Sequence, residues 1–136
     1  MNNCELSAMI HTSMAHQCEQ RGYATPVDVL MDIGVLTKGK YNDWRFGRVP
    51  FLEAVCAVNL AKLSFIMRTI REYAQEHELK PSFTCYKQWG LKTKGKRPVV
   101  LLRFSKSGNP VIEKQYSTHY VDKARIEALK TAPAEE

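Results

Sequence analysis

The chain has 136 residues, of which 44% are hydrophobic and 25% are charged, so it can bury one core. No apolar run reaches the roughly 18–20 residues of a membrane helix, because charges interrupt every candidate. The first residues lack the basic and apolar regions of a signal peptide. We therefore expect a cytoplasmic protein with one globular domain over residues 1–130 and a flexible tail over 131–136.

The net charge of +6 is unevenly distributed along the sequence. Residues 79–112 contain eight Lys or Arg and no Asp or Glu, so the rest of the chain carries a net charge of −2. The positive charge is therefore local, and it favours an anionic partner such as DNA or RNA. Excess charge also promotes solubility, so charge alone does not define a function.

The four cysteines, Cys4, Cys18, Cys56 and Cys85, form no C-x-x-C pair. In a reducing compartment this spacing indicates free thiols, two of them buried as small hydrophobic side chains. No pattern of His, Cys, Asp or Glu matches a metal site, and no cofactor motif is complete. We therefore expect neither a metal nor a cofactor.

Helices are predicted throughout the first 78 residues, at 3–21, 26–33, 38–45, 51–58 and 60–78. Thr25 followed by Pro26 is typical of a helix start, because Thr can cap and Pro loses nothing at the first position. The strongest pattern is that of residues 60–78, where apolar residues repeat at steps of three and four. Asn59 is the expected cap of that helix.

The two short helices on either side of Gly34 suggest a helix-turn-helix, but the register disagrees. The buried apolar positions of that motif fall about six and nine residues after the turn glycine, which here are Lys40 and Asp43. The aromatic residues come one place later, at Tyr41 and Trp44. We therefore expect a helical hairpin that supports the core rather than this DNA-binding motif.

The second half of the chain is predicted to be mixed. Residues 82–89 suggest a short helix, residues 91–97 a polar loop, and residues 99–105 a strand. Residues 122–130 suggest a last helix. Residues 111–121 are ambiguous, because they are rich in β-formers but follow the helix-start signal Asn-Pro.

A hairpin between residues 99–105 and 111–121 is the favoured reading, since a lone strand would leave its backbone donors and acceptors unpaired. The expected fold class is mostly α (α+β), a compact helical domain with a small C-terminal β-hairpin. The predicted core consists of Leu30, Ile33, Leu36, Trp44, Leu52, Val55, Leu63, Ile66, Met67, Ile70, Trp89, Leu101 and Phe104.

The sequence contains no strong catalytic motif. Cys85 could pair with His119 or His77, but no family signature surrounds it, and no catalytic residue is predicted. Residues 106–109, Lys-Ser-Gly-Asn, resemble a fragment of a phosphate-binding loop without its full spacing.

The preferred function is therefore binding of DNA or RNA by a small regulatory protein of bacterial type, with no membrane association. Cations would neutralise phosphates, and interleaved aromatic residues would stack on unpaired bases. The predicted contact residues are Lys87, Lys92, Lys94, Lys96, Arg97, Arg103 and Lys106, joined by Arg45 and Arg48. The alternative is a non-catalytic protein-interaction or regulatory module in which the basic loop is only a solvated connection. Its partner would be another protein or a second copy of the chain.

Overall fold

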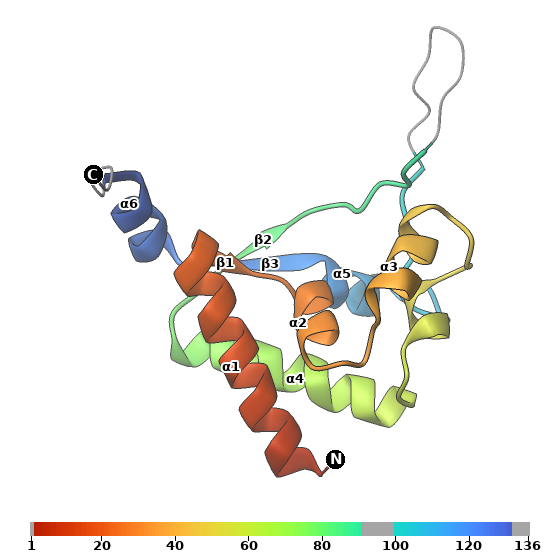
Figure 1. The fold of residues 1–136 in the computed structure, drawn as a ribbon, viewed down its shortest axis with the longest axis horizontal. Coiled ribbons are helices and arrows are strands. Elements are labelled where there is room, and N and C mark those ends of the chain that lie inside the picture. Colours follow the sequence, from red (N-terminus) through yellow and green to blue (C-terminus); the bar gives the residue numbers. More distant parts are fainter. Residues whose placement is uncertain (1, 91–99, 132–136) are drawn as a thin grey trace, which may run out of the picture.

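A computed structural model describes residues 2–90 and 100–131 (Figure 1). The predicted loop 91–97, the first residue of the predicted strand 99–105 and all but the first residue of the predicted tail lie outside this range. The elements are, in order, α1 (Asn3–Arg21), β1 (Tyr23–Ala24), α2 (Pro26–Asp32), α3 (Lys38–Arg45), the 3-10 turn η1 (Leu52–Val55), α4 (Leu60–Glu76), β2 (Lys80–Phe83), α5 (Pro110–Ser117), β3 (Thr118–Val121) and α6 (Lys123–Thr131). The prediction of a mostly helical chain with a small amount of β structure is confirmed.

Side-chain caps set the starts of the N-terminal helices, as the sequence predicts. The Thr25 hydroxyl accepts a hydrogen bond from the Asp28 N–H at 3.1 Å, and Pro26 occupies the first turn. The Asn59 side chain accepts from the Lys62 N–H at 2.9 Å and begins α4. The predicted helix over 51–58 is wrong in length, because only the four residues of η1 are helical.

The sheet is built around β3, which is its central strand. The order is β1-β3-β2 and both pairings are antiparallel, with Tyr23 opposite Val121 and Phe83 opposite Thr118. Figure 1 shows this small sheet among the helices, with α1 and α4 crossing beside it. The sheet therefore brings residues near 23, 83 and 119 together, although they are far apart in the sequence.

The predicted hairpin of residues 99–105 with 111–121 is wrong. Residues 110–117 form α5, because the Asn109 side chain accepts from the N–H groups of Val111 and Ile112 and Pro110 sits in the first turn. Only residues 118–121 form a strand, and their partners are β1 and β2. The local capping chemistry outweighed the β-forming side chains, and segments not predicted as strands supplied the missing hydrogen bonds.

The predicted helix over 82–89 is also wrong. Residues 80–83 form β2, and the following residues run antiparallel to residues 100–102. The Gln88 N–H donates to the Val100 carbonyl at 2.8 Å, and the Leu102 N–H donates to the Tyr86 carbonyl at 2.8 Å. We call this pairing the stem.

Trp44 lies at the centre of the aromatic part of the core. It is fully buried, its indole N–H donates to the Arg103 carbonyl at 2.8 Å, and its ring contacts Phe104 and Tyr86. Most predicted core residues are buried, but Val55 is only half-buried. Trp89 and Leu101 were wrongly assigned to the core, since 37% and 58% of them are exposed. Both belong to the stem segments, which lie on the surface.

Candidate nucleic-acid interface

The described cations of the predicted contact set fall into two groups. Arg45, Arg48 and Lys87 lie around the end of α3 and the base of the stem, where the Trp89 N–H donates to the Arg45 carbonyl at 2.7 Å. Arg103 and Lys106 lie on the segment that leads to α5. The four remaining predicted cations, Lys92, Lys94, Lys96 and Arg97, lie outside the described residues.

Arg45 is surrounded by aromatic rings. Its guanidinium carbon lies 4.4 Å from the centroid of the Trp89 ring and 5.1 Å from that of Tyr86. Nη1 donates to the Tyr41 hydroxyl at 3.3 Å, while the buried Nε has no hydrogen-bond partner in residues 2–90 and 100–131. Within the described residues no carboxylate pairs with Arg45. An unpaired buried donor costs about 1–3 kcal/mol, so this guanidinium has hydrogen-bonding capacity that the described side chains do not use.

Exposed rings and cations continue around Arg45. Phe46 is 41% exposed and its ring contacts that of Trp89, with centroids 5.5 Å apart. Arg48 lies over Phe46 but is paired with Asp43 at 3.1 Å, which reduces its net charge contribution. Lys87 is exposed on the stem, opposite Leu101. We call Arg45, Phe46, Arg48, Lys87 and Trp89 the Arg45 surface.

The Arg103 side chain and the Lys106 backbone make hydrogen bonds to nearby parts of the protein. The Arg103 guanidinium donates to the carbonyl oxygens of Ser105 and Lys106 and lies over the Phe51 ring. The Lys106 N–H donates to the Glu53 carboxylate at 2.9 Å. These contacts fold the segment back on itself and reduce the capacity of Arg103 to bind a phosphate.

The predicted phosphate-loop fragment does not present a cradle of N–H groups. The Gly108 N–H donates to the Ser105 hydroxyl at 3.0 Å, and the Asn109 N–H donates to the Ser107 hydroxyl at 3.2 Å. The N–H of Ser105 is taken by the Glu113 carboxylate. Because an anion would have to displace these partners, the loop is a structural turn in this fold.

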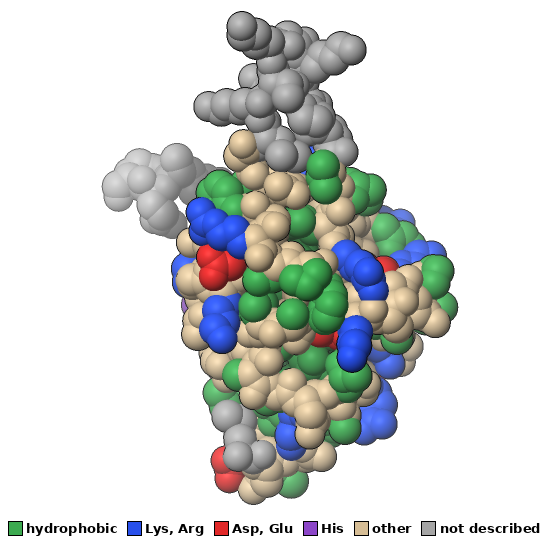
Figure 2. All heavy atoms as spheres, turned by 90° about the vertical axis from the view of Figure 1, so that its right-hand side faces the viewer, with side chains coloured by type: hydrophobic (Ala, Val, Ile, Leu, Met, Phe, Trp, Pro, Cys, Tyr) green, Lys and Arg blue, Asp and Glu red, His purple; other side chains and the backbone are tan. Residues whose placement is uncertain are grey.

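Figure 2 shows the face that carries α3, η1 and the start of α4. Lys and Arg side chains are spread around a central hydrophobic patch on this face, and acidic side chains are visible at only a few points. The cations therefore frame an apolar surface rather than gathering at one point.

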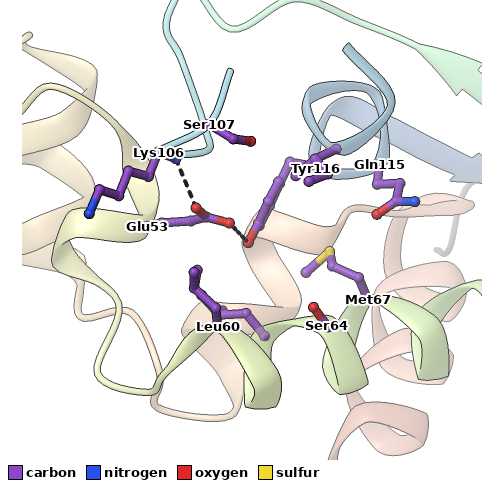
Figure 3. Close-up of a pocket in the computed structure, with 10 residues that line it drawn as sticks. Glu53, Leu60, Ser64, Met67, Lys106, Ser107, Gln115 and Tyr116 are labelled. Carbon is purple, nitrogen blue, oxygen red and sulfur yellow. Dashed lines mark hydrogen bonds between the residues drawn. The ribbon is translucent and has the colours of Figure 1, made fainter. Parts of the chain in front are cut away.

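A cavity of about 520 Å³ lies between the start of α4 and α5 (Figure 3). Leu60 and Met67 form its apolar side, and the Glu53 carboxylate lies in its middle. That carboxylate is already satisfied, since it accepts hydrogen bonds from the Lys106 N–H and from the Tyr116 hydroxyl at 2.8 Å. Burial and the Glu53 hydrogen bond raise the pKa of Tyr116 above its usual range, so its proton stays in place.

A second, more polar cavity of about 200 Å³ lies behind Arg45. We call it the arginine pocket. It is lined by residues of α1, β1, α2 and its cap, α3, β3 and the segment after β2: Arg21, Tyr23, Thr25, Asp28, Tyr41, Arg45, Thr84, Cys85, Tyr86 and His119. The Tyr86 hydroxyl and His119 Nε2 lie 3.3 Å apart, and the rings of His119 and Tyr23 stack. Burial, together with Arg21, lowers the pKa of His119.

The hypothesis of a Cys85–histidine catalytic pair gains no support from these contacts. Cys85 is exposed and lines the same cavity as His119, but Nε2 of that histidine faces the Tyr86 hydroxyl. His77 stacks on Tyr73 at the end of α4 and lines a different cavity. In the described residues no group of three or more His, Cys, Asp or Glu could hold a metal ion.

Sequence reasoning missed the arginine pocket and the aromatic surroundings of Arg45. Tyr23, Tyr41 and His119 come from three separate segments, so only the sheet and α3 bring them together. One signal was present, because Arg45 follows Tyr41 by four residues on the same helix and so shares its face.

Comparison of the chain with protein-family models, with curated proteins and with solved structures gives no match. None of the helices in the described residues is both long enough and apolar enough to cross a bilayer. The site must therefore be interpreted from its own chemistry.

Proposed function

We propose that this protein binds nucleic acid, with a preference for unpaired strands, through the Arg45 surface. The observation that carries the proposal is the Arg45 guanidinium, which is free of any described carboxylate and lies against the partly exposed Trp89 ring. Cations neutralise phosphates, and exposed rings offer stacking platforms of about 1–3 kcal/mol per base. Lys87 adds a second exposed cation nearby.

The sequence extends this basic character. Lys92, Lys94, Lys96 and Arg97 lie between the two sides of the stem in sequence and remain predicted contact residues. Arg103 and Lys106 remain in the proposal, but Arg103 is the weaker candidate because its guanidinium already donates to backbone carbonyl oxygens.

Fluorescence anisotropy titrations with single-stranded DNA, single-stranded RNA and duplex DNA at two salt concentrations test the proposal. Binding should favour the single strands and weaken steeply with salt, because each phosphate contact releases counterions. Trp89→Ala should weaken single-strand binding by about tenfold or more, given the stacking energy at stake. No binding to any of the three at low salt would refute the proposal.

Phe83→Ala is the matched control for Trp89→Ala. Phe83 is also exposed, at 59%, but it lies on β2 with Lys114 over its ring and lines a different cavity from Arg45. Its replacement should leave the affinity unchanged.

A variant with Lys92, Lys94, Lys96 and Arg97 replaced by Gln should lose affinity for single strands, and its affinity should depend less steeply on salt concentration.

The alternative of a protein-interaction module is favoured by the apolar side chains around the same surface. Val100, Leu101, Phe46 and Trp89 are all exposed. In that case light scattering should show a stable oligomer, or Leu101→Ser should abolish capture of a protein partner while nucleic-acid binding is absent. A monomer that binds single strands would exclude this alternative as the main function.

A further inference from the structure

The arginine pocket holds one positive charge that the described chain does not neutralise. Arg21 is paired with Asp28 at 2.6 Å, so these two charges cancel. His119 is half-buried, and its lowered pKa keeps the ring neutral at pH 7. Arg45 remains without a described carboxylate partner. The pocket therefore has a net charge of about +1.

The hydrogen bonds of Arg45 are also incomplete. A guanidinium has five N–H donors, and within the described residues the Arg45 side chain donates one hydrogen bond, from Nη1 to the Tyr41 hydroxyl. Nε is buried and has no hydrogen-bond partner among the residues that the structure describes. Buried polar atoms are nearly always hydrogen-bonded in folded proteins. An acceptor bound beside this side chain would let the guanidinium turn and complete its bonds.

The size and the walls of the cavity restrict what that acceptor can be. A volume of about 200 Å³ is below the roughly 300–1,000 Å³ of pockets that enclose a whole small molecule. It suits a single anionic group attached to something larger outside. Rings of Tyr23, Tyr41 and Tyr86 line it, and such partly desolvated walls strengthen a charge-assisted hydrogen bond.

We propose that the arginine pocket binds the terminal phosphate monoester of a nucleotide, with Arg45 as its direct ligand. The planar guanidinium matches phosphate oxygens in pairs, which an ammonium group does not. A monoester is connected to its carrier on one side only, so it fits a cavity with room for one group. The carrier is a free mononucleotide or the end of a single strand. Only the identification of the carrier as a nucleotide rests on the function proposed above.

Isothermal titration calorimetry with inorganic phosphate, adenosine 5′-monophosphate and adenosine tests the phosphate site by itself. The nucleotide should bind and adenosine should bind at least about tenfold more weakly, the change expected when a charge-assisted hydrogen bond is lost. Single-stranded oligonucleotides with a 5′-phosphate, a 3′-phosphate or no terminal phosphate then separate the two carriers. A preference for one phosphorylated end identifies the strand.

Arg45→Gln should abolish the preference for phosphate, and Arg45→Lys should restore only part of it because the paired geometry is lost. Arg71→Gln is the matched control. Arg71 is another half-buried arginine with an unpartnered atom, Nη1, but it lies on α4 and lines a different cavity. Its replacement should leave phosphate binding unchanged. Circular dichroism shows whether each variant folds. If Arg45→Gln does not fold, the phosphate preference of Arg45→Lys tests the role of Arg45 instead.

The outcomes separate this inference from the proposed function. Oligonucleotide binding without any effect of a terminal phosphate, together with no binding of adenosine 5′-monophosphate, would overturn the phosphate pocket and leave the function standing. Binding of the mononucleotide without binding of any strand would support the pocket and overturn the function. Equal losses in Arg45→Gln and Arg71→Gln would overturn the assignment of Arg45.

Discussion

At the scale of single residues, charged side chains in this protein are satisfied in unequal ways. Glu113 and Glu53 accept hydrogen bonds from backbone N–H groups of the segment 104–106 and hold it in place. Arg45 is instead held by rings and one hydroxyl. The sequence predicted helices around Glu53 and Arg45 but a strand around Glu113, and it did not indicate which of these side chains would have spare hydrogen-bonding capacity, because the tertiary contacts of Glu53 and of the Arg45 guanidinium come from distant segments.

Replacing Glu113 should destabilise the fold. Its carboxylate accepts from the N–H groups of Phe104 and Ser105 and from the Ser105 hydroxyl. Glu113→Ala should lower the free energy of unfolding by about 2 kcal/mol, because part-buried donors lose their acceptor. Urea denaturation measures the loss, and Glu19→Ala, at an exposed position on α1, is the control. Equal stability of the two variants would contradict the assigned role.

The cysteines should differ in reactivity. Burial raises the pKa of Cys56 to about 12, and burial also raises the pKa of Cys18, whereas Cys4 and Cys85 are exposed. Since the thiolate is the reactive form, iodoacetamide at pH 8 should modify Cys4 and Cys85 first. Mass spectrometry of peptides over time gives the four rates. In guanidinium chloride the four should react at similar rates, and rapid labelling of Cys56 in the native protein would show that its burial is wrong.

At the scale of elements, helices with local start signals could be predicted and strands could not. Thr25 and Asn59 cap helices from within four residues of sequence, so no distant contact is needed. β2 has all four residues exposed and contains Pro81, and so it lacks the alternating pattern of a half-buried strand. Its pairing with β3 depends on a chain segment almost forty residues later. Tertiary contacts therefore decided what local patterns left open.

The junction between α1 and β1 should tolerate no side chain at Gly22. Gly22 has a φ of +82°, and an added Cβ would lie 2.3 Å from Cγ1 of Ile126 on α6. Gly22→Ala should therefore destabilise the fold by at least about 1–2 kcal/mol. Gly39, inside α3, has open space around it, so Gly39→Ala should raise stability by roughly 0.5–1 kcal/mol. Thermal melts of the pair provide the measurement, and a stabilising Gly22→Ala would contradict this contact.

At the scale of the whole molecule, the sheet brings the N-terminal, middle and C-terminal parts of the chain to the arginine pocket. Arg21, Tyr86 and His119 come from these three parts. The sequence alone shows the charge excess of residues 79–112, and the anionic partner that it favours stays a prediction. It could not predict where the cations would converge. The acid-free stretch splits between the Arg45 surface and a segment that is engaged with Glu53 and Glu113.

Stability should depend on pH through His119. Its folded-state pKa lies below the ordinary 6.5, mainly because of burial and then because of Arg21. The unfolded chain therefore binds more protons below pH 6.5, and the free energy of unfolding should fall as the pH drops through that value. His119→Gln should flatten this dependence, while His16→Gln, at an exposed position, should not. Urea melts at pH 7.5 and 5.5 give the difference, and an unchanged slope in His119→Gln would rule out this contribution.

The stem has a consequence for protein engineering. The Gln88 N–H donates to the Val100 carbonyl, so the two sides of the stem are joined directly although eleven residues separate these two positions in sequence. Replacing residues 91–99 by a short turn containing Asn-Gly should therefore preserve the melting temperature, because closing a shorter connection costs less entropy. The stem should then accept an inserted foreign peptide in place of residues 91–99. A chain shortened in this way lacks Lys92, Lys94, Lys96 and Arg97 but keeps every residue of the Arg45 surface.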